Sequence, residues 1–382
     1  MARIVVVGLT GGPCSGKSTA LSVISEKIPA MTGWQVFTLK EAATHLMEQG
    51  MPLKEALRAS KMEEVWVHQR GIIQWTCCNL NVMRESARVT GRNTLIAMDR
   101  PTRDGWVYQD PPFRDEHYAH LLRDAGYTPE DAFKECDAII KLTTAAYGAE
   151  AYYTCANNHA RDESLEEARA LDDLIERAYL GWGHFRPVGN ATGFQEKIGN
   201  VIREICGVVG VPQPLEIEKK YLLARMPDLD AFPVPYQKIH IEQTYLLPEE
   251  GEEEVRVRRR SFDGNSWVYY LTRKSMMTPS GVRTETERLL DWKEYYHLLR
   301  RRDPAAGTIR KFRYCFLWEG QYFELDAFNG VAEGPLMEIE LTDAARSVVL
   351  PPFVPVRDEV TGRAYYSNRE IALRHPDAAT AR

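Results

Sequence analysis

One short segment near the start of the chain constrains the fold more than any other. Gly11-Gly12-Pro13-Cys14-Ser15-Gly16-Lys17-Ser18 follows the β-branched run Ile4–Val7 and precedes a helical pattern over Thr19–Ile28. Glycines let such a loop curl until its backbone N–H groups converge, while the helix start and Lys17 add positive charge. The spacing G-x-x-x-x-G-K-S in this context predicts a phosphate-binding loop over Gly11–Thr19, with the Ser18 hydroxyl placed for Mg²⁺.

The first half of the chain alternates between short strands and longer helices. The other predicted elements are the strands Val36–Leu39, Thr94–Met98 and Ala138–Leu142 and the helices Leu165–Arg177 and Phe194–Cys206. Such alternation favours a parallel sheet with helices on both faces, so we expect an α/β domain over residues 1–207. Residues 208–214, which include two prolines, are expected to be a stiff linker.

Acidic residues follow two of these strands. Glu41 and Asp99 stand at strand ends, where ligands bind in parallel sheets, so one is expected to handle a metal and one to accept a proton. Glu41 could instead only cap the next helix, and Asp104 is a further candidate. Arg161, before an acidic helix start, is expected either to close over a phosphoryl group or to be a solvated surface arginine.

Like charges recur two residues apart in the second half, residues 215–376, where short alternating segments predict an antiparallel β domain. Residues 377–382 are expected to be a flexible tail. The pairs are Glu216/Glu218, Arg256/Arg258, Glu285/Glu287, Lys311/Arg313, Glu324/Asp326 and Glu338/Glu340, joined by the single residues Lys220 and Lys274.

A single pair of this kind is most simply explained as two residues on the solvent-exposed face of a sheet. Six pairs, each of one sign and mostly separated by apolar residues, are harder to explain in that way, because like charges on one strand face repel each other. A barrel with a charged interior accounts for the separation, with carboxylates for metal and basic residues for phosphate. The eight acidic residues outnumber the six basic ones, so two divalent cations would make the lining attractive to a polyphosphate.

The first half resembles P-loop ATPases and kinases, which share the strand-end acid followed by arginine, here Asp99-Arg100. The segment around Arg161 resembles the lid of P-loop nucleotide kinases. The resemblance implies that Gly11, Gly12, Pro13, Cys14, Ser15, Gly16, Lys17, Ser18, Thr19 and Arg161 bind ATP or GTP. No residue pattern separates ATP from GTP, and none identifies a phosphate acceptor.

The second half resembles the CYTH superfamily of triphosphate tunnel metalloenzymes, beginning with Glu216-Ile217-Glu218-Lys219-Lys220 and ending with Tyr366-Ser367-Asn368. This implies an eight-stranded antiparallel barrel that hydrolyses a triphosphate with Mg²⁺ or Mn²⁺. Glu216, Glu218, Lys220 and Lys274 would then be catalytic, while Asp99 and Glu41 are expected to be catalytic because of their places at strand ends of the first domain. Triphosphate would be bound by Lys220, Arg256, Arg258, Lys274, Lys311 and Arg313. Metals would be held by Glu216, Glu218, Glu285, Glu287, Glu324, Asp326, Glu338 and Glu340, and a separate metal by Ser18 of the phosphate-binding loop.

Tyr245 is expected either near the leaving group or as a buried structural residue.

The order of the two domains also resembles the TRPL translocation-defect family. That resemblance implies a rival function: a trafficking adaptor that binds GTP and phosphatidic acid without hydrolysing anything. A further alternative is adenylyl cyclase chemistry of the class IV type, which differs from hydrolysis in how the triphosphate is placed. The complete set of charges favours hydrolysis, because binding a headgroup needs only the basic half.

Composition excludes several other classes of protein. Hydrophobic residues make up 44% and charged residues 27%, with a net charge of −6, so disorder and a nucleic-acid-coating role are disfavoured. No apolar run reaches the ~18 residues of a membrane span. Seven cysteines without a CxxC pair fit reduced thiols, and a cytoplasmic location is expected.

Overall fold

The computed structural model describes residues 2–153, 163–210, 217–250, 252–275, 285–330, 334–341 and 347–376. The chain forms two compact units, Met1–Val211 and Pro212–Arg382. We call them unit 1 and unit 2 and describe each by itself. Among the described helices, none is both long and apolar enough to cross a bilayer.

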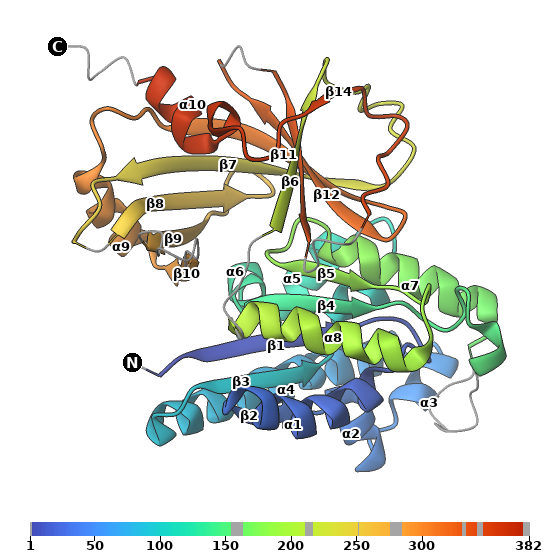
Figure 1. The fold of residues 1–382 in the computed structure, drawn as a ribbon. Coiled ribbons are helices and arrows are strands. Elements are labelled where there is room, and N and C mark those ends of the chain that lie inside the picture. The colour runs from blue at the N-terminus through green and yellow to red at the C-terminus, as the bar shows by residue number, and fades with distance from the viewer. Residues whose placement is uncertain are drawn as a thin grey trace. The chain divides into compact units, whose positions relative to one another are not determined.

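Unit 1 contains a five-stranded parallel sheet in the order β2-β3-β1-β4-β5 (Figure 1). Its strands are β1 (Ile4–Thr10), β2 (Gln35–Leu39), β3 (Thr94–Asp99), β4 (Ala138–Leu142) and β5 (Phe185–Val188). The predicted α/β fold is confirmed, and β5 is an additional strand. The β3 strand is buried along its whole length, as expected for a parallel sheet covered on both faces.

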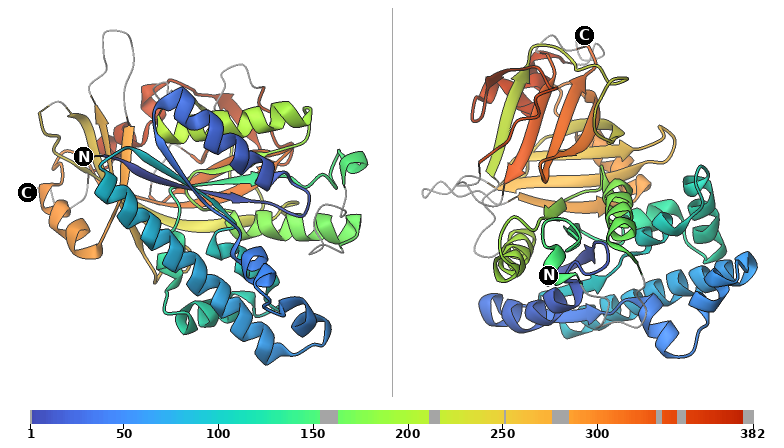
Figure 2. Two further views of the ribbon diagram at one scale, coloured as in Figure 1. Left: turned by 90° about the horizontal axis from the view of Figure 1, so that it is seen from below. Right: turned by 90° about the vertical axis from the view of Figure 1, so that its right-hand side faces the viewer.

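The helices of unit 1 cover both faces of the sheet. They are α1 (Lys17–Thr32), α2 (Ala42–Glu48), α3 (Leu53–Arg58), α4 (Met62–Thr90), α5 (Arg114–Asp124), α6 (Pro129–Phe133), α7 (Leu165–Tyr179) and α8 (Phe194–Val209), with the 3₁₀ turns η1 (Thr102–Tyr108) and η2 (Glu150–Tyr152). Ile24 of α1 and Ile205 of α8 pack into one core cluster. Leu80 of α4, the long helix in Figure 2, packs into a cluster that includes Val6 and Ile96.

Unit 2 contains an antiparallel sheet in the order β10-β9-β8-β7-β11-β12-β13-β6-β14. The strands are β6 (Ile217–Leu223), β7 (Tyr236–Leu246), β8 (Glu252–Ser261), β9 (Val268–Ser275), β10 (Glu285–Leu290), β11 (Ile309–Trp318), β12 (Gln321–Phe328), β13 (Leu336–Leu341) and β14 (Val356–Glu359). Strand direction turns strongly across the sheet (Figure 2). The predicted antiparallel β fold is confirmed, with nine described strands in place of eight, and among the described residues the edge strands β10 and β14 do not pair to close a barrel.

Strand register places the charged pairs on one face of this sheet, which we call the charged face. Arg313 lies opposite Asp326, Glu324 opposite Glu338, and Glu338 opposite Lys220. On β11, β12 and β13 the alternate residues Phe316, Phe323 and Met337 face the other way and form an apolar core there. The apolar core therefore lies behind the charged face.

Short helices complete unit 2. They are α9 (Trp292–Leu298) and α10 (Asn368–Arg374), with the 3₁₀ turns η3 (Leu299–Arg301) and η4 (Ala364–Tyr366). Ile371 of α10 packs with Leu222, Ile309 and Leu336 at one end of the charged face.

Candidate functional site

The phosphate-binding loop of unit 1 has the backbone that its glycines allow. Gly11 and Gly16 adopt φ values of +141° and +95°, and a Cβ on Gly11 would lie 2.0 Å from the carbonyl oxygen of Leu142. Helix α1 begins at Lys17, so Ser18 and Thr19 are exposed in its first turn. The loop thus combines glycines at positive φ with a helix N-terminus, and this is the arrangement that binds phosphate.

Lys17 is buried against this loop. Its Nζ donates to the carbonyl oxygens of Gly11 at 2.7 Å and Gly12 at 3.3 Å, and to Ser15 Oγ at 3.1 Å. Burial, followed by the positive charge of Arg100, lowers the pKa of Lys17 to about 8.

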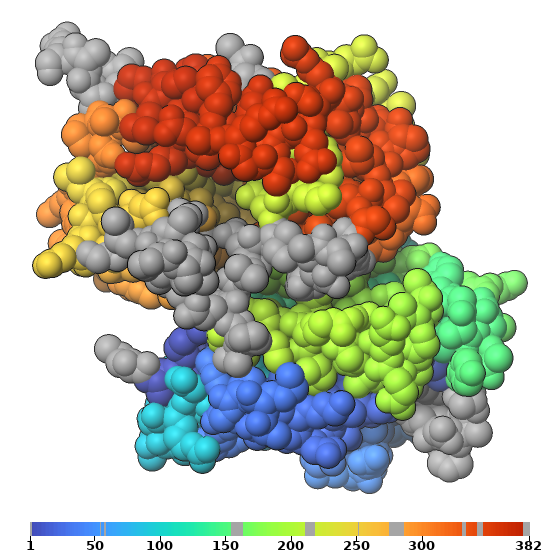
Figure 3. Space-filling view, in the orientation of Figure 1, coloured from blue at the N-terminus to red at the C-terminus, as the bar shows by residue number. Residues whose placement is uncertain are grey.

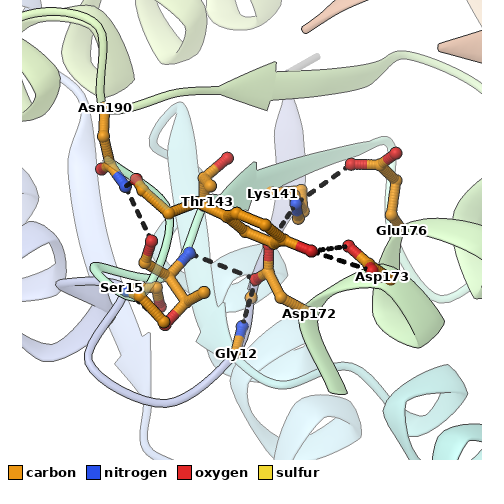
Figure 4. Close-up of polar contacts among 12 residues, drawn as sticks. Gly12, Ser15, Lys141, Thr143, Asp172, Asp173, Glu176 and Asn190 are labelled. Carbon is orange, nitrogen blue, oxygen red and sulfur yellow. Dashed lines mark hydrogen bonds and ion pairs between the residues drawn. The ribbon is translucent and has the colours of Figure 1, made fainter. Parts of the chain in front are cut away.

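Asp172 of α7 joins the loop to the rest of unit 1 (Figure 4). Its Oδ1 accepts hydrogen bonds from the backbone N–H groups of Gly12 at 2.8 Å and Thr144 at 3.2 Å. Its Oδ2 accepts one from Lys141 Nζ at 2.6 Å, and Lys141 also reaches Glu176 at 3.1 Å. Asp172 and Lys141 are almost fully buried, so this ion pair fixes the phosphate-binding loop against α7 and β4.

The strand-end acids gather around Arg100. The Arg100 guanidinium pairs with Glu41 and Asp104, each at 2.8 Å, and Asp104 also accepts hydrogen bonds from Thr10 and Tyr179. Asp99 is buried, and its Oδ1 has no hydrogen-bond partner among the described residues. Burial, opposed in part by the positive charge of Lys17, raises the pKa of Asp99 to about 6.

Glu135 holds the start of η1, the turn that carries Asp104. Its Oε2 accepts from the backbone N–H of Thr102 at 2.8 Å and from its hydroxyl at 3.1 Å, while Oε1 has no partner in the described part of unit 1. Burial raises the pKa of Glu135 to about 7, although the Thr102 hydrogen bonds oppose the shift.

Glu135→Gln should therefore change the pH dependence of stability. A carboxyl whose folded-state pKa is raised stabilises the fold fully below its unfolded pKa, and loses that advantage as pH rises to its folded pKa. The unfolding free energy of the wild type should fall between pH 4 and pH 8, whereas the glutamine of the variant cannot ionise. The difference in unfolding free energy, variant minus wild type, should therefore be about 3 kcal/mol larger at pH 8 than at pH 4. Urea denaturation at both pH values measures this difference, and a difference independent of pH would contradict the prediction.

Arg313 is the centre of the charged face of unit 2. Its guanidinium donates to Asp326 through Nε and Nη2, each at 2.7 Å, to Glu338 at 3.1 Å, and also to Glu324. Lys311 Nζ donates to Asp326 at 2.5 Å. Asp326 is fully buried with both oxygens in use, so Arg313, Lys311 and Asp326 form a fixed charged centre.

Lys220 and two carboxylates lie beside this centre. Lys220 Nζ is 2.9 Å from a carboxylate oxygen of Glu338 and 3.2 Å from one of Glu218. Burial, followed by repulsion from Glu338, raises the pKa of Glu218 to about 8. Burial opposes ionisation of Glu338, but the positive charges of Lys220 and Lys311 outweigh it and lower the pKa of Glu338.

The neighbouring strands β8 and β9 contribute most of the remaining basic residues. Arg258 pairs with Glu287 at 2.7 Å, and Arg256 lies 3.6 Å from Glu254. Lys274 is buried on the same face. Tyr245 is buried and lies opposite Arg256, and its hydroxyl accepts a hydrogen bond from Gln243 at 2.9 Å.

The structure brings most predicted residues of unit 2 onto the charged face, and Glu340, opposite Glu218, is its exposed member. Glu216, the side chain of Glu285, and Arg161 of unit 1 lie outside what is described. In the described residues, no three His, Cys, Asp or Glu side chains are arranged as a metal site. The metal assignments therefore stay predictions.

Sequence reasoning missed three residues with a structural part in these sites. Arg260, buried on the charged face, continues the two-residue spacing of Arg256 and Arg258, so that signal was present. Lys141 and Asp172 gave no signal, because they meet the phosphate-binding loop only in the folded chain.

Comparison with known proteins agrees with the fold of unit 1. A family model described as an AAA domain matches residues 6–197, and the chain belongs to this family. None of the curated proteins matches the chain.

Several solved structures resemble a part of the chain. The inorganic triphosphatase NE1496 is 29% identical, with 42% of this chain and 97% of that chain covered and a TM-score of 0.31. PH1012 from Pyrococcus horikoshii is 19% identical, with 34% and 80% covered and a TM-score of 0.26. HpAC1 from Hippeastrum, described with a dominant triphosphatase activity, has the same values. At these TM-scores the likeness assigns no activity.

Proposed function

We propose that unit 2 binds and hydrolyses a triphosphate on its charged face. The observation that carries the proposal is that seven basic side chains are buried or partly buried on one sheet face, and that at least five of them lie within 4 Å of a carboxylate. The seven are Lys220, Arg256, Arg258, Arg260, Lys274, Lys311 and Arg313. A polyphosphate is the small ligand whose spaced negative charges match such a row, and arginine forks suit its oxygens.

The carboxylates on the charged face fit a divalent cation by their chemistry. Register sets Glu340 opposite Glu218 and Glu324 opposite Glu338, so four oxygen-donor side chains share three neighbouring strands. Oxygen donors of this kind suit Mg²⁺ or Mn²⁺. When bound, such a cation supplies neutralisation of phosphate charge and activation of water. Arg313, held by Asp326, would orient the phosphate chain, and Lys220 would keep Glu338 ionised.

We further propose that unit 1 binds ATP or GTP through Gly11–Thr19. The loop geometry, the α1 N-terminus and buried Lys17 support phosphate binding. Asp99, with a buried oxygen free of hydrogen bonds among the described residues, would serve a metal or accept a proton from a substrate hydroxyl. Unit 1 would then act as a small-molecule kinase or as a nucleotide hydrolase.

Two variants of the full chain separate these functions. Lys17→Met should weaken nucleotide binding about 10- to 100-fold, because a charged contact to phosphate is lost, and should leave hydrolysis of tripolyphosphate unchanged. Replacing Glu216 and Glu218 together with Gln should abolish hydrolysis of tripolyphosphate and leave nucleotide binding unchanged. Calorimetric titration with ADP and phosphate release from tripolyphosphate measure the two properties. If the double variant keeps its triphosphatase activity, the assignment of the charged face is wrong.

A further inference from the structure

A half-exposed aromatic ring lies against the phosphate-binding loop of unit 1. Phe194 is the first residue of α8, and 47% of it is exposed. A Cβ built on Gly16 would lie 2.8 Å from Cε2 and 3.3 Å from Cζ of this ring. The ring therefore approaches the loop backbone directly before Lys17, where only glycine leaves room for it.

The ring continues the apolar stripe of α8 beyond the core. Phe194 precedes Ile198 by four residues, and Val201, Ile202 and Ile205 follow at helical spacing. Those four are buried in the core cluster of unit 1, whereas Phe194 is not. The outer surface of α8 is visible in Figure 3. The apolar stripe of α8 thus continues beyond the core cluster, and its N-terminal residue, Phe194, lies at the phosphate-binding loop.

A hydrogen-bonded network fixes the segment that leads into Phe194 (Figure 4). Asn190 Nδ2 donates to the carbonyl oxygens of Thr144 and Tyr147, each at 2.7 Å, and Lys197 Nζ donates to Asn190 Oδ1 at 2.7 Å. Thr144 in turn donates through its hydroxyl to the carbonyl oxygen of Pro13 and through its N–H to Asp172. The start of α8 is therefore anchored to the phosphate-binding loop through Asn190 and Thr144.

We propose that the Phe194 ring is the surface on which the base of a bound nucleotide stacks. The inference rests on the proposed nucleotide binding by unit 1 and adds the ligand's second recognition element. A nucleotide joins a charged phosphate chain to a flat heteroaromatic base, and here a phosphate-binding loop adjoins a positioned aromatic ring. Stacking tolerates any base because every base has a π-face. We therefore expect ADP and GDP to bind with similar affinities.

Calorimetric titration of the full chain with ADP, GDP and pyrophosphate tests the proposal. The Lys17→Met variant defines how much of each signal belongs to the loop. Phe194→Ala should weaken ADP and GDP binding about 5- to 150-fold and leave pyrophosphate binding unchanged, because stacking is worth about 1–3 kcal/mol per base. Phe194→Trp should keep wild-type affinity, and Phe194→Leu should resemble the alanine variant although it keeps apolar bulk.

Met31→Ala is the matched control. Met31 is 57% exposed and lies near the other end of α1, roughly 21 Å along the helix from Lys17, so its removal should change none of the affinities. A parallel loss of pyrophosphate binding in Phe194→Ala would show that the ring only shapes the loop, and would overturn the proposal. Unchanged ADP and GDP affinities would overturn it as well. If the wild type shows no binding that depends on Lys17, the proposed nucleotide binding fails, and this inference with it.

Discussion

Glu338→Gln is expected to lower phosphate release from tripolyphosphate by at least about 100-fold. Glu338 contacts Lys220 at 2.9 Å and Arg313 at 3.1 Å, and lies opposite Glu324 in the strand register. Glutamine keeps the shape of the Glu338 side chain but removes its negative charge. That charge orients Lys220 and Arg313 and would help to hold a metal. A loss of about 3 kcal/mol in transition-state stabilisation corresponds to this factor. Initial rates with Mg²⁺ and saturating substrate measure the effect.

Glu242→Gln is the matched control for that variant. Glu242 lies on the opposite face of β7 and pairs with Arg259 at 2.8 Å, so the change removes an ion pair of unit 2 without touching the charged face. Its activity should stay within about twofold of wild type, as expected for a partly exposed pair of small energetic value. Equal losses in both variants would point to stability rather than to the site, and full activity of Glu338→Gln would contradict the account.

Lys141→Met should lower the unfolding free energy of unit 1 by about 3–5 kcal/mol. Removing one partner of a buried ion pair leaves the other charge uncompensated, and Asp172 is as buried as Lys141. Asp172 also receives the Gly12 N–H, so the phosphate-binding loop should loosen with it. Urea denaturation of the full chain, followed by circular dichroism, measures the loss.

Two further variants test the cause of that loss. Adding Asp172→Asn to Lys141→Met should recover part of the stability, because the uncompensated charge is then gone while an oxygen still accepts from Gly12. Lys134→Met breaks the partly exposed ion pair between Lys134 and Glu130, four residues apart. It should lower the unfolding free energy by only about 0.5 kcal/mol. A cost below about 1 kcal/mol for Lys141→Met would show that the buried pair does not stabilise the loop.

The parts of the fold that follow from local rules could be predicted from the sequence. The phosphate-binding loop is a contiguous motif, and its glycines, strand and helix all carry their own signals. The charged face was predictable because strand residues alternate, so a two-residue spacing fixes a shared face before any strand order is known. The same rule would have included Arg260.

Contacts between distant segments could not be predicted in this way. Asp172 lies 160 residues from Gly12, and nothing in a helix sequence shows that one of its aspartates will be buried under a loop. Lys141 sits in a short apolar strand, where a lone lysine gives no hint of its partner. Phe194 looks like any other apolar residue of an amphipathic helix, and only its packing against Gly16 sets it apart.

The most direct test of the central claim is phosphate release by the purified full chain with Mg²⁺, offering tripolyphosphate, ATP and GTP in parallel and EDTA as the blank. We expect fast, metal-dependent release from tripolyphosphate that is lost when Glu218 and Glu338 are replaced together with Gln. No release from any of the three, with nucleotide binding retained, would contradict it. That result would favour a non-hydrolytic adaptor, and phospholipid headgroups such as phosphatidic acid would be the next ligands to test.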